Sequence, residues 1–156
     1  MLLYEIPGRG TIRIKNIVFD YNGTIAVDGK LLAGVKELIQ QLKLKVNIYI
    51  LTADTYGTVA QECSSLGIET MSFPQGAASQ AKKEVVLKLG AENTMCIGNG
   101  YNDIEMCKTA ALSIGVIEQE GCCSKLLLHT DIVATSIKNA LEIILNPDRV
   151  KATLRN

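Results

Sequence analysis

Short apolar runs that alternate with helical patterns are the feature that most constrains the fold of this chain. The runs 17–19, 46–51, 94–97 and 112–116 contain no charged residue, and each is short enough to be one buried strand. Between the runs, apolar residues take the spacing of a helix face, as at i, i+3, i+4 and i+7 in 35–42. Strands that alternate with helices in this way predict an α/β fold with a mostly parallel central sheet and helices on both faces.

Two segments are predicted to form hairpins instead. The strand-like stretches 2–6 and 11–15 flank a Pro- and Gly-rich turn signal, which predicts an N-terminal hairpin. Residues 25–30, called the flap below, contain an Asp-Gly pair that favours tight hairpin turns. Because the flap follows the first core strand directly, we expect it to stand over the end of that strand.

Length and charge narrow the classes of protein that this chain can represent. It has 156 residues, which predicts a single domain over 1–156. Lys plus Arg and Asp plus Glu number 16 each, so no charge surplus indicates a nucleic acid or an anionic membrane as a partner. No apolar stretch approaches the ~18 residues needed to cross a bilayer, so no membrane span is expected.

The five cysteines predict a reducing compartment rather than a disulfide framework. Their number is odd, Cys122 and Cys123 are adjacent, and no signal peptide is recognised. We therefore expect a cytoplasmic protein. His129 is the only histidine and no Cys-x-x-Cys occurs, which argues against a zinc site.

A carboxylate follows the first core strand. Asp20 comes directly after the apolar run, at the position where open α/β sheets carry their chemistry. Gly23 and Thr24 then suit a tight turn whose backbone N–H groups and hydroxyl hold an anion. This arrangement predicts a nucleophilic carboxylate aimed at a bound phosphate, although Asn22 stands where a second carboxylate would be expected.

Three further polar clusters follow predicted strands or lie at a helix start. They are Thr52-Ala53-Asp54, the pair Lys82 and Lys83, and Gly98-Asn99-Gly100-Tyr101-Asn102-Asp103. Because the carboxyl ends of parallel strands share one edge of a sheet, the strand-end clusters are expected to converge on Asp20. A lysine at a helix start would reach the same place.

Each cluster has a role in phosphoryl transfer. Asp20 attacks phosphorus in line and forms an aspartyl-phosphate. Thr52 gives a hydroxyl to a phosphate oxygen, with Ala53 beside it, and Lys82 neutralises charge on the transferring group. Asp54 is predicted to cap the helix that follows it.

Mg²⁺ is the expected cofactor for this chemistry. The ion prefers hard oxygen ligands and keeps several of its waters. Asp20 and the backbone carbonyl of Asn22 would supply two oxygens. Asn99 or Asp103 would supply or orient another.

Together these motifs resemble the four motifs of the haloacid dehalogenase-like phosphohydrolase superfamily, over residues 17–145. More narrowly, the segments 20–24, 51–54 and 98–104 resemble the phosphorylation domain of P-type ATPases, and the chain is similar to the soluble P-type-ATPase-like group. The resemblance implies a three-layer Rossmann-like fold, dependence on Mg²⁺ and phosphate-ester chemistry. The gaps between the motifs are too short for a separate cap domain, so only the flap is expected to cover the site.

The sequence departs from the family pattern at two positions. The family usually has Asp two residues after the nucleophile as general acid and base, and Asn22 cannot carry a proton there. Losing such a group commonly costs about 10²–10⁴ in rate. The Asp that binds Mg²⁺ in the family is replaced by Asn99, a weaker ligand, while Asp103 is retained. The family spacing favours Lys82 over Lys83 as the catalytic lysine.

We therefore predict a slow Mg²⁺-dependent phosphohydrolase that acts on an unidentified phosphorylated substrate. The alternative is a phosphate- or metabolite-binding or regulatory module whose site has lost catalysis, which the two Asn residues motivate. A third interpretation, a response-regulator receiver, needs an acidic pair on its first strand, and residues 12–19 contain none. The N-terminal hairpin is a candidate for pairing with a second copy of the chain.

Overall fold

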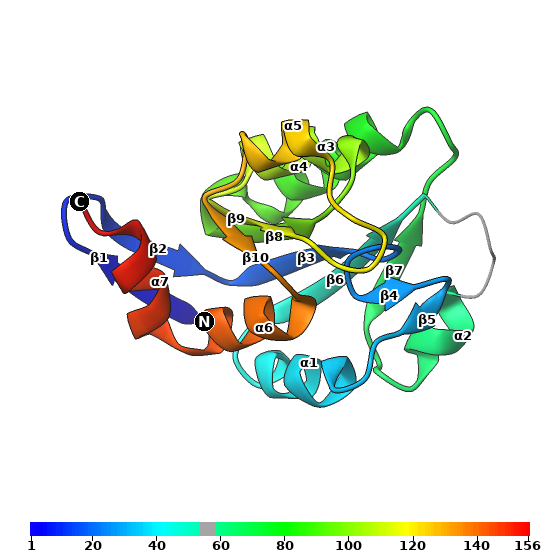
Figure 1. The fold of residues 1–156 in the computed structure, drawn as a ribbon, viewed down its shortest axis with the longest axis horizontal. Coiled ribbons are helices and arrows are strands. Elements are labelled where there is room, and N and C mark those ends of the chain that lie inside the picture. Colours follow the sequence, from blue (N-terminus) through cyan, green and yellow to red (C-terminus); the bar gives the residue numbers. More distant parts are fainter. Residues whose placement is uncertain (54–58) are drawn as a thin grey trace.

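A six-stranded parallel sheet forms the centre of the fold (Figure 1). The structure is a computed structural model that describes residues 1–53 and 59–156. The strands lie in the order β10-β9-β8-β3-β6-β7, and every neighbouring pair is parallel. Their bounds are Asn16–Asp20 for β3, Asn47–Thr52 for β6, Glu69–Ser72 for β7, Thr94–Gly98 for β8, Leu112–Val116 for β9 and Ile132–Ala134 for β10. The parallel sheet predicted from the sequence is confirmed.

Helices cover both faces of the sheet, which is what strands of continuous apolar residues require. One face carries α1 (Val35–Lys43), α2 (Val59–Ser64) and α6 (Ile137–Leu145), and the other carries α3 (Ala78–Leu89), α4 (Ile104–Thr109) and the short α5 (Ser124–Leu127) (Figure 1). Single turns of 3-10 helix at Ala91–Asn93 and Tyr101–Asp103 flank β8. The three layers are those of the predicted Rossmann-like fold.

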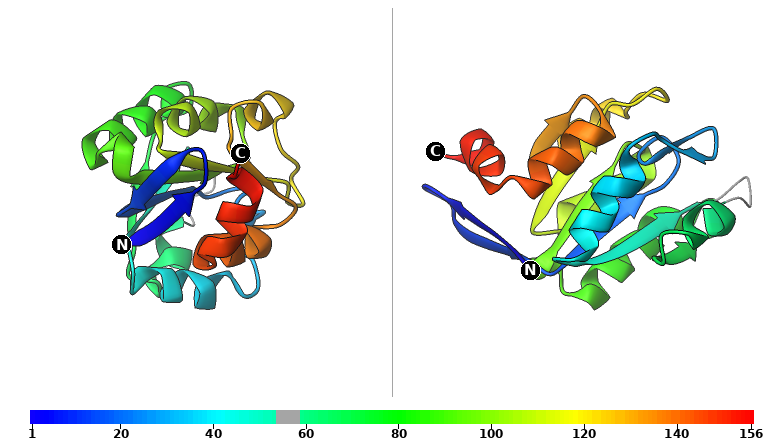
Figure 2. Two further views of the ribbon diagram at one scale, coloured as in Figure 1. Left: turned by 90° about the vertical axis from the view of Figure 1, so that its left-hand side faces the viewer. Right: turned by 90° about the horizontal axis from the view of Figure 1, so that it is seen from below.

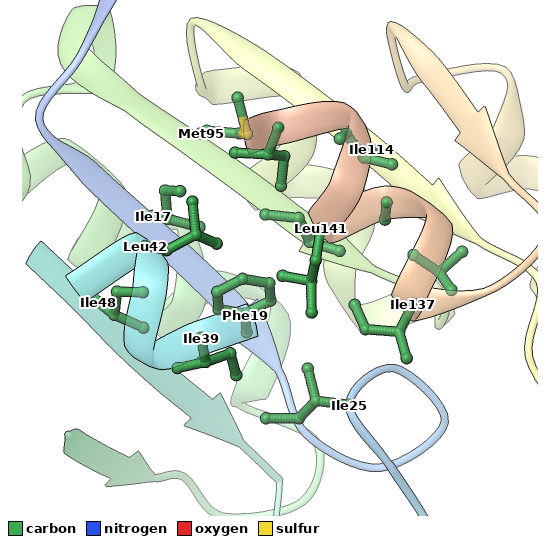
Figure 3. Close-up of a cluster of buried hydrophobic side chains, with 14 of the residues drawn as sticks. Ile17, Phe19, Ile25, Ile39, Leu42, Ile48, Met95, Ile114, Ile137 and Leu141 are labelled. Atoms are coloured by element: carbon green, nitrogen blue, oxygen red, sulfur yellow. The ribbon is translucent and has the colours of Figure 1, made fainter. Parts of the chain in front are cut away.

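The central strand β3 is buried on both sides by two hydrophobic clusters. Phe19 belongs to the cluster under α1 and α6, where Figure 3 shows it beside Ile39 and Leu141. Val18 points to the opposite face and packs in a second cluster with Val86 of α3. The side chains of these five residues, three in the first cluster and two in the second, are fully buried. Burying one such apolar side chain stabilises the fold by about 1.5–3 kcal/mol. The two clusters together fix the end of β3, where the first polar motif begins.

The N-terminal hairpin extends away from the sheet (Figure 2). Its strands, β1 (Leu2–Ile6) and β2 (Gly10–Ile14), pair antiparallel as predicted. Buried Tyr4 donates a hydrogen bond from its hydroxyl to the carbonyl oxygen of Ile144 at 2.8 Å. This contact ties the hairpin to the end of α6.

The tail after α6 forms a helix for which the sequence pattern gave no prediction. This helix, α7 (Pro147–Leu154), begins at a proline. Proline is favoured there because the N–H of the first helical residue makes no hydrogen bond within the helix. The side chain of Asn146 caps it by accepting a hydrogen bond from the backbone N–H of Asp148 at 3.2 Å. The Asn-Pro pair that ends α6 therefore also starts α7, which packs on β1.

The flap stands at the carboxyl edge of the sheet, as expected. Its strands, β4 (Ala26–Val27) and β5 (Lys30–Leu31), pair around Asp28 and Gly29, whose φ angles of 50° and 79° are left-handed. Such angles at both turn positions are typical of two-residue hairpin turns. Tyr21 donates a hydrogen bond from its hydroxyl to the Gly29 carbonyl at 3.0 Å and so anchors the turn.

Two features are missing from the part of the chain that the structure describes. No separate cap domain stands over the carboxyl edge of the sheet in residues 1–53 and 59–156, as predicted. In the same residues, none of the helices has both the length and the apolar composition that crossing a membrane requires.

Candidate active site

The predicted clusters meet at the carboxyl edge of the sheet, around a cavity of about 420 Å³. Asp20 ends β3, Thr52 ends β6, and the loop of Asn99 follows β8. The cavity is lined by Asp20, Asn22, Asp28, Thr52, Ala53, Asn99, Gly100, Asn102 and Glu120. Asp54, predicted to cap the next helix, lies outside the described residues.

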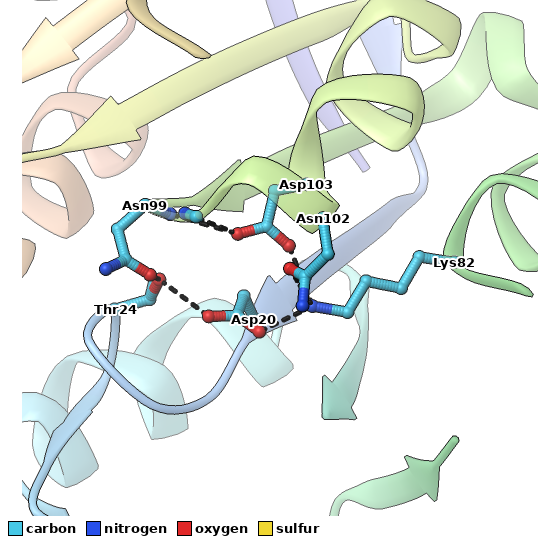
Figure 4. Close-up of polar contacts among 7 residues, drawn as sticks. Asp20, Thr24, Lys82, Asn99, Asn102 and Asp103 are labelled. Carbon is cyan, nitrogen blue, oxygen red and sulfur yellow. Dashed lines mark hydrogen bonds and ion pairs between the residues drawn. The ribbon is translucent and has the colours of Figure 1, made fainter. Parts of the chain in front are cut away.

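Beside this cavity, Lys82 binds two carboxylates at once (Figure 4). Its ammonium nitrogen lies 2.6 Å from Oδ1 of Asp20 and 2.7 Å from Oδ1 of Asp103. The side-chain oxygen of Asn102 accepts a third hydrogen bond at 3.3 Å. The side chains of Lys82 and Asp103 are fully buried. Charges this deep persist only when partners satisfy them, so the three groups depend on one another.

The charges of this cluster alter one another's proton affinity. Burial and the neighbouring Asp103 raise the pKa of Asp20 to about 6, against the lowering effect of the Lys82 ammonium and the Thr24 hydroxyl. Burial alone would lower the pKa of Lys82, but the two carboxylates raise it above its ordinary value. At neutral pH the site therefore holds an ionised Asp20 against a protonated lysine.

The structure separates the two adjacent lysines of α3. Lys82 ends at Asp20, whereas the ammonium of Lys83 lies 3.4 Å from a carboxylate oxygen of Glu105 on α4, at the surface. Neighbouring residues on a helix point about 100° apart, so only one of the two can enter the site. This geometry agrees with the family spacing, which favours Lys82.

Both oxygens of Asp103 are occupied by protein donors. Besides the lysine on Oδ1, the backbone N–H groups of Asn99 and Gly100 donate to Oδ2 at 3.1 and 2.9 Å. Gly98 makes room for this arrangement, because a Cβ on it would lie 2.6 Å from Cγ of Asp103. Asp103 therefore joins the loop after β8 to Lys82, and its fully buried side chain is not among those that line the cavity.

Asn99 is oriented by a partner at each end of its amide (Figure 4). Its Oδ1 lies 3.1 Å from the hydroxyl of Thr24, and its Nδ2 donates to the carbonyl of Gly121 at 3.1 Å. The Thr24 hydroxyl also lies 3.2 Å from Oδ2 of Asp20. Since a hydroxyl has one proton, the two oxygens share it. Thr24 is thus buried between Asp20 and Asn99 and is not among the residues that line the cavity, and its predicted anion-binding role stays a prediction.

Asn22 lines the cavity, but its side-chain oxygen is buried and finds no hydrogen-bond partner among the described residues. A buried acceptor left unpaired costs about 1–3 kcal/mol, and such groups in native proteins usually pair with water or a ligand. Thr52 and Ala53 line the same cavity from the end of β6. With Asp20 and Asn99, five of the predicted site residues therefore line one cavity.

Four cavity residues were not among the predicted site residues: Gly100, Asn102, Asp28 of the flap and Glu120 after β9. The backbone N–H of Asp28 donates to Oε1 of Glu120 at 3.0 Å, which joins the flap to the loop after β9. A signal for Glu120 exists in the sequence, because it follows the apolar run of β9 as the other motifs follow theirs. Asp28 carries no such signal, since only the folded flap turns it toward the cavity.

The oxygen atoms at this edge are suitable ligands for a hard cation that binds weakly. Among the described residues, Oδ2 of Asp20 and Oδ1 of Asn99 share a single hydrogen-bond donor, the Thr24 hydroxyl. Throughout residues 1–53 and 59–156, no group of three or more Asp, Glu, His or Cys side chains is arranged to hold a metal. A cation here would depend on one carboxylate, neutral oxygens and water, a set that Mg²⁺ accepts.

The fold is similar to that of solved phosphatases. The 3-deoxy-D-manno-octulosonate 8-phosphate phosphatase from Moraxella catarrhalis, solved with magnesium, phosphate and a KDO molecule, has a TM-score of 0.71 at 21% identity, over 91% of this chain and 94% of that one. The cobalt-bound phosphatase for the same class of substrate from Haemophilus influenzae has a TM-score of 0.72 at 14% identity, over 92% and 94%. Phosphoserine phosphatase in its apo form has 0.69 at 17% identity, over 85% and 98%. At these identities the likeness shows the fold alone.

Sequence similarity extends to two uncharacterized proteins of Methanocaldococcus jannaschii. MJ0073 is 42% identical over 85 residues, which are 52% of this chain and 91% of the relative. MJ0072 is 59% identical over 39 residues, which are 25% of this chain and 89% of the relative. The family of haloacid dehalogenase-like hydrolases matches residues 8–111, more than half of the chain. The chain belongs to the haloacid dehalogenase-like hydrolase family.

Proposed function

We propose that this protein is a Mg²⁺-dependent phosphohydrolase that works through an aspartyl-phosphate on Asp20. One observation carries the proposal. Asp20 ends the central strand, lines the cavity and lies 2.6 Å from the buried ammonium of Lys82. The Asp20 carboxylate is thus a nucleophile held next to a positive charge. Phosphoryl transfer needs such a charge, and burial keeps the Lys82 ammonium in place.

The reaction takes place in two displacements at phosphorus. First, a carboxylate oxygen of Asp20 attacks, the bond from phosphorus to the leaving oxygen breaks, and that oxygen takes a proton from solvent. Water then attacks the same phosphorus, the bond to Asp20 breaks, and inorganic phosphate leaves with the free carboxylate restored. Lys82, with the hydroxyl of Thr52 and the backbone at Ala53, balances charge on the phosphoryl oxygens in both steps.

Mg²⁺ would be held by Asp20, the backbone carbonyl of Asn22 and the amide oxygen of Asn99, with water completing its shell. The bound ion supplies a positive charge that neutralises the phosphoryl group. Asp103 is proposed to position the site rather than bind the ion, because its side chain is fully buried and is not among the residues that line the cavity. The magnesium in the Moraxella catarrhalis phosphatase supports this choice of ion.

Asn22 makes the proposed enzyme slow at the second displacement. An amide neither donates a proton to the leaving oxygen nor takes one from the attacking water, so solvent must do both. The unpaired side-chain oxygen of Asn22 faces no protein donor among the described residues. We therefore propose that the aspartyl-phosphate forms more readily than it is hydrolysed.

The substrate is proposed to be a phosphate ester of a small polar molecule. The cavity is lined mainly by polar side chains and is bounded by the flap, with no cap domain in the described residues to enclose a large apolar group. The substrate of the Moraxella catarrhalis phosphatase, a sugar-acid phosphate by its name, is an example of this class.

A phosphatase assay with Mg²⁺ on a panel of phosphorylated metabolites tests the proposal. Wild type and Asp20→Asn are compared, because the substitution keeps the shape and the acceptor for Lys82 but removes the nucleophile. We expect release of phosphate from wild type alone. Equal rates for the two proteins would refute the catalytic role of Asp20.

A binding module that has lost catalysis is the second candidate, and Asn22 and Asn99 favour it. Calorimetry with Mg²⁺ and beryllium fluoride, which mimics the phosphoryl group on a carboxylate, discriminates between the two functions. Tight binding of the mimic that requires Mg²⁺ and Asp20 supports the enzyme. Binding that is the same in Asp20→Asn supports the module.

A further inference from the structure

Glu120 brings a carboxylate to the Asn99 side of the cavity from outside the family motifs. It lies in the loop after β9, and its Oε1 accepts the backbone N–H of Asp28 at 3.0 Å. Its side chain lines the same cavity as Asp20. The contact with the flap therefore holds the Glu120 carboxylate in place at the rim of the site.

The second oxygen of Glu120 lies close to the Asn99 amide. A Cβ built on Gly23 would meet Oε2 of Glu120 at 2.8 Å, and the atom nearest to it is Nδ2 of Asn99. Both atoms therefore crowd the same small space over Gly23, which only a glycine leaves open. Figure 4 shows that this amide nitrogen lies on the side of Asn99 away from Asp20. The amide thus presents its oxygen toward Asp20 and its nitrogen toward Glu120.

An aspartate at position 99 would be disfavoured by these surroundings. The oxygen that replaced Nδ2 would face the carbonyl of Gly121, to which Nδ2 now donates at 3.1 Å, and the carboxylate of Glu120. Like charges this close repel one another. Asn99 and Glu120 therefore form a matched pair, in which an amide is favoured over a carboxylate because the Glu120 carboxylate lies behind it.

We propose that Glu120 supplies to the Mg²⁺ site the negative charge that Asn99 lacks. The charge acts from outside the ligand shell, through the Asn99 amide and the water of the cavity. A direct contact with the metal is not needed, and no cluster of three acidic, His or Cys side chains that could hold one occurs in the described residues. This inference rests on the proposed function, because it concerns the same metal site.

Outer groups of this kind have measurable effects on metal binding. Residues that orient or polarise a ligand commonly change metal affinity by 10- to 100-fold when they are replaced. Here a negative charge beside the amide nitrogen strengthens the dipole of Asn99 and makes its oxygen a better ligand. The loop after β9 thus compensates for the loss of the family's aspartate.

Titration calorimetry with MgCl₂ tests the proposal in wild type, Glu120→Gln, Asn99→Asp and the double variant. Gln keeps an oxygen that accepts from the Asp28 N–H, so the fold of the flap is preserved and only the charge is lost. We expect Glu120→Gln to weaken Mg²⁺ binding by about 10-fold in the Asn99 background. In the Asn99→Asp background the same change should weaken binding by less than about twofold, since position 99 then carries its own charge.

Two results would overturn the proposal: unchanged affinity in Glu120→Gln, or an equal loss in both backgrounds. The comparison of Glu120→Gln with wild type does not depend on the folding of Asn99→Asp. Thermal unfolding in chelator shows whether each variant is folded. Asp28→Asn is the matched control, because its side chain lines the same cavity while its backbone N–H still binds Glu120. A loss as large as that of Glu120→Gln would also contradict the specific pairing.

The same titrations separate this inference from the proposed function. If wild type binds Mg²⁺ and Asp20→Asn does not, the metal site of the proposed function is supported. If Glu120→Gln then binds as tightly as wild type, only the role of Glu120 is refuted. Wild type that fails to bind Mg²⁺ would count against both.

Discussion

The two sides of the site are built differently. On the Lys82 side, the charged groups are buried and paired. The Lys82 ammonium forms ion pairs with Asp20 and Asp103, and the second oxygen of Asp103 accepts hydrogen bonds from two backbone N–H groups. On the other side, the amides of Asn22 and Asn99 lie at the two positions where the motif resemblance implies carboxylates. There the side-chain oxygen of Asn22 has no partner among the described residues, and the Glu120 carboxylate is exposed at the rim.

In the proposed function, this difference separates the steps that the chain retains from those that it performs slowly. The paired side would hold the groups that accept a phosphoryl group and balance its charge. The amide side would hold the two positions at which the motif resemblance implies carboxylates that move protons and bind the metal. We therefore expect phosphoryl transfer to Asp20 to be preserved and its hydrolysis to be slow.

Replacing Lys82 by Met should have the largest effect. It leaves two buried carboxylates without their cation, which should lower the free energy of unfolding by about 3–5 kcal/mol and abolish phosphate release. Urea unfolding and the phosphatase assay measure the two effects. Lys83→Met on the same helix is the matched control, and its surface pair with Glu105 predicts a loss below about 1 kcal/mol. Equal losses in the two variants would contradict the assignment of Lys82.

Restoring the family carboxylate with Asn22→Asp should have the next largest effect. It provides a group that can carry a proton to the leaving oxygen and from water, so turnover should rise by about 10²-fold or more. Steady-state release of phosphate with Mg²⁺ measures the change. The double variant Asn22→Asp with Asp20→Asn is the control and should be inactive. Unchanged turnover would mean that proton transfer does not limit the reaction.

Asp20 should make stability depend on pH in the absence of metal. Its pKa of about 6 in the folded state lies above its ordinary value of 3.8, so the folded state holds this proton more tightly than the unfolded state. The stabilisation from this proton is present below about pH 4 and is lost as the pH rises through 6. Asp20→Asn cannot titrate, so its stability relative to wild type should increase by on the order of 2 kcal/mol between about pH 4 and pH 7.5.

Urea unfolding of both proteins in chelator measures this difference, and other titrating groups cancel in the comparison. A gap between the two proteins that stays constant with pH would contradict a raised pKa for Asp20. The effect belongs to the paired side of the site, because burial and Asp103 are what raise the pKa.

The strand-end rule explains how much of the site the sequence predicts. Asp20, Thr52 and Asn99 each follow an apolar run, and parallel strands bring such positions to one edge whatever the details of packing. The choice between Lys82 and Lys83 needed the rotation of α3 about its axis, which depends on side-chain packing. The helix that begins at Pro147 was not predicted from the sequence, because a proline that ends one helix can also start the next.

Contacts between loops lie beyond what spacing can predict. Glu120 reaches Asp28 across a separation of 92 residues, and the meeting of the two loops depends on the turn of the flap. The role of Asp103 likewise depends on Gly98, whose missing side chain lets the carboxylate reach two backbone N–H groups. Such features follow from the folded geometry and not from a residue pattern.

Acid quench of wild type with a phosphorylated substrate and Mg²⁺, followed by mass spectrometry of the peptide that contains Asp20, tests the central claim most directly. We predict a phosphoryl group on Asp20 that accumulates within one turnover, decays slowly and is absent from Asp20→Asn. In Asn22→Asp the same group should decay faster. Turnover of substrate with no phosphoryl group on Asp20 at any time would contradict the account.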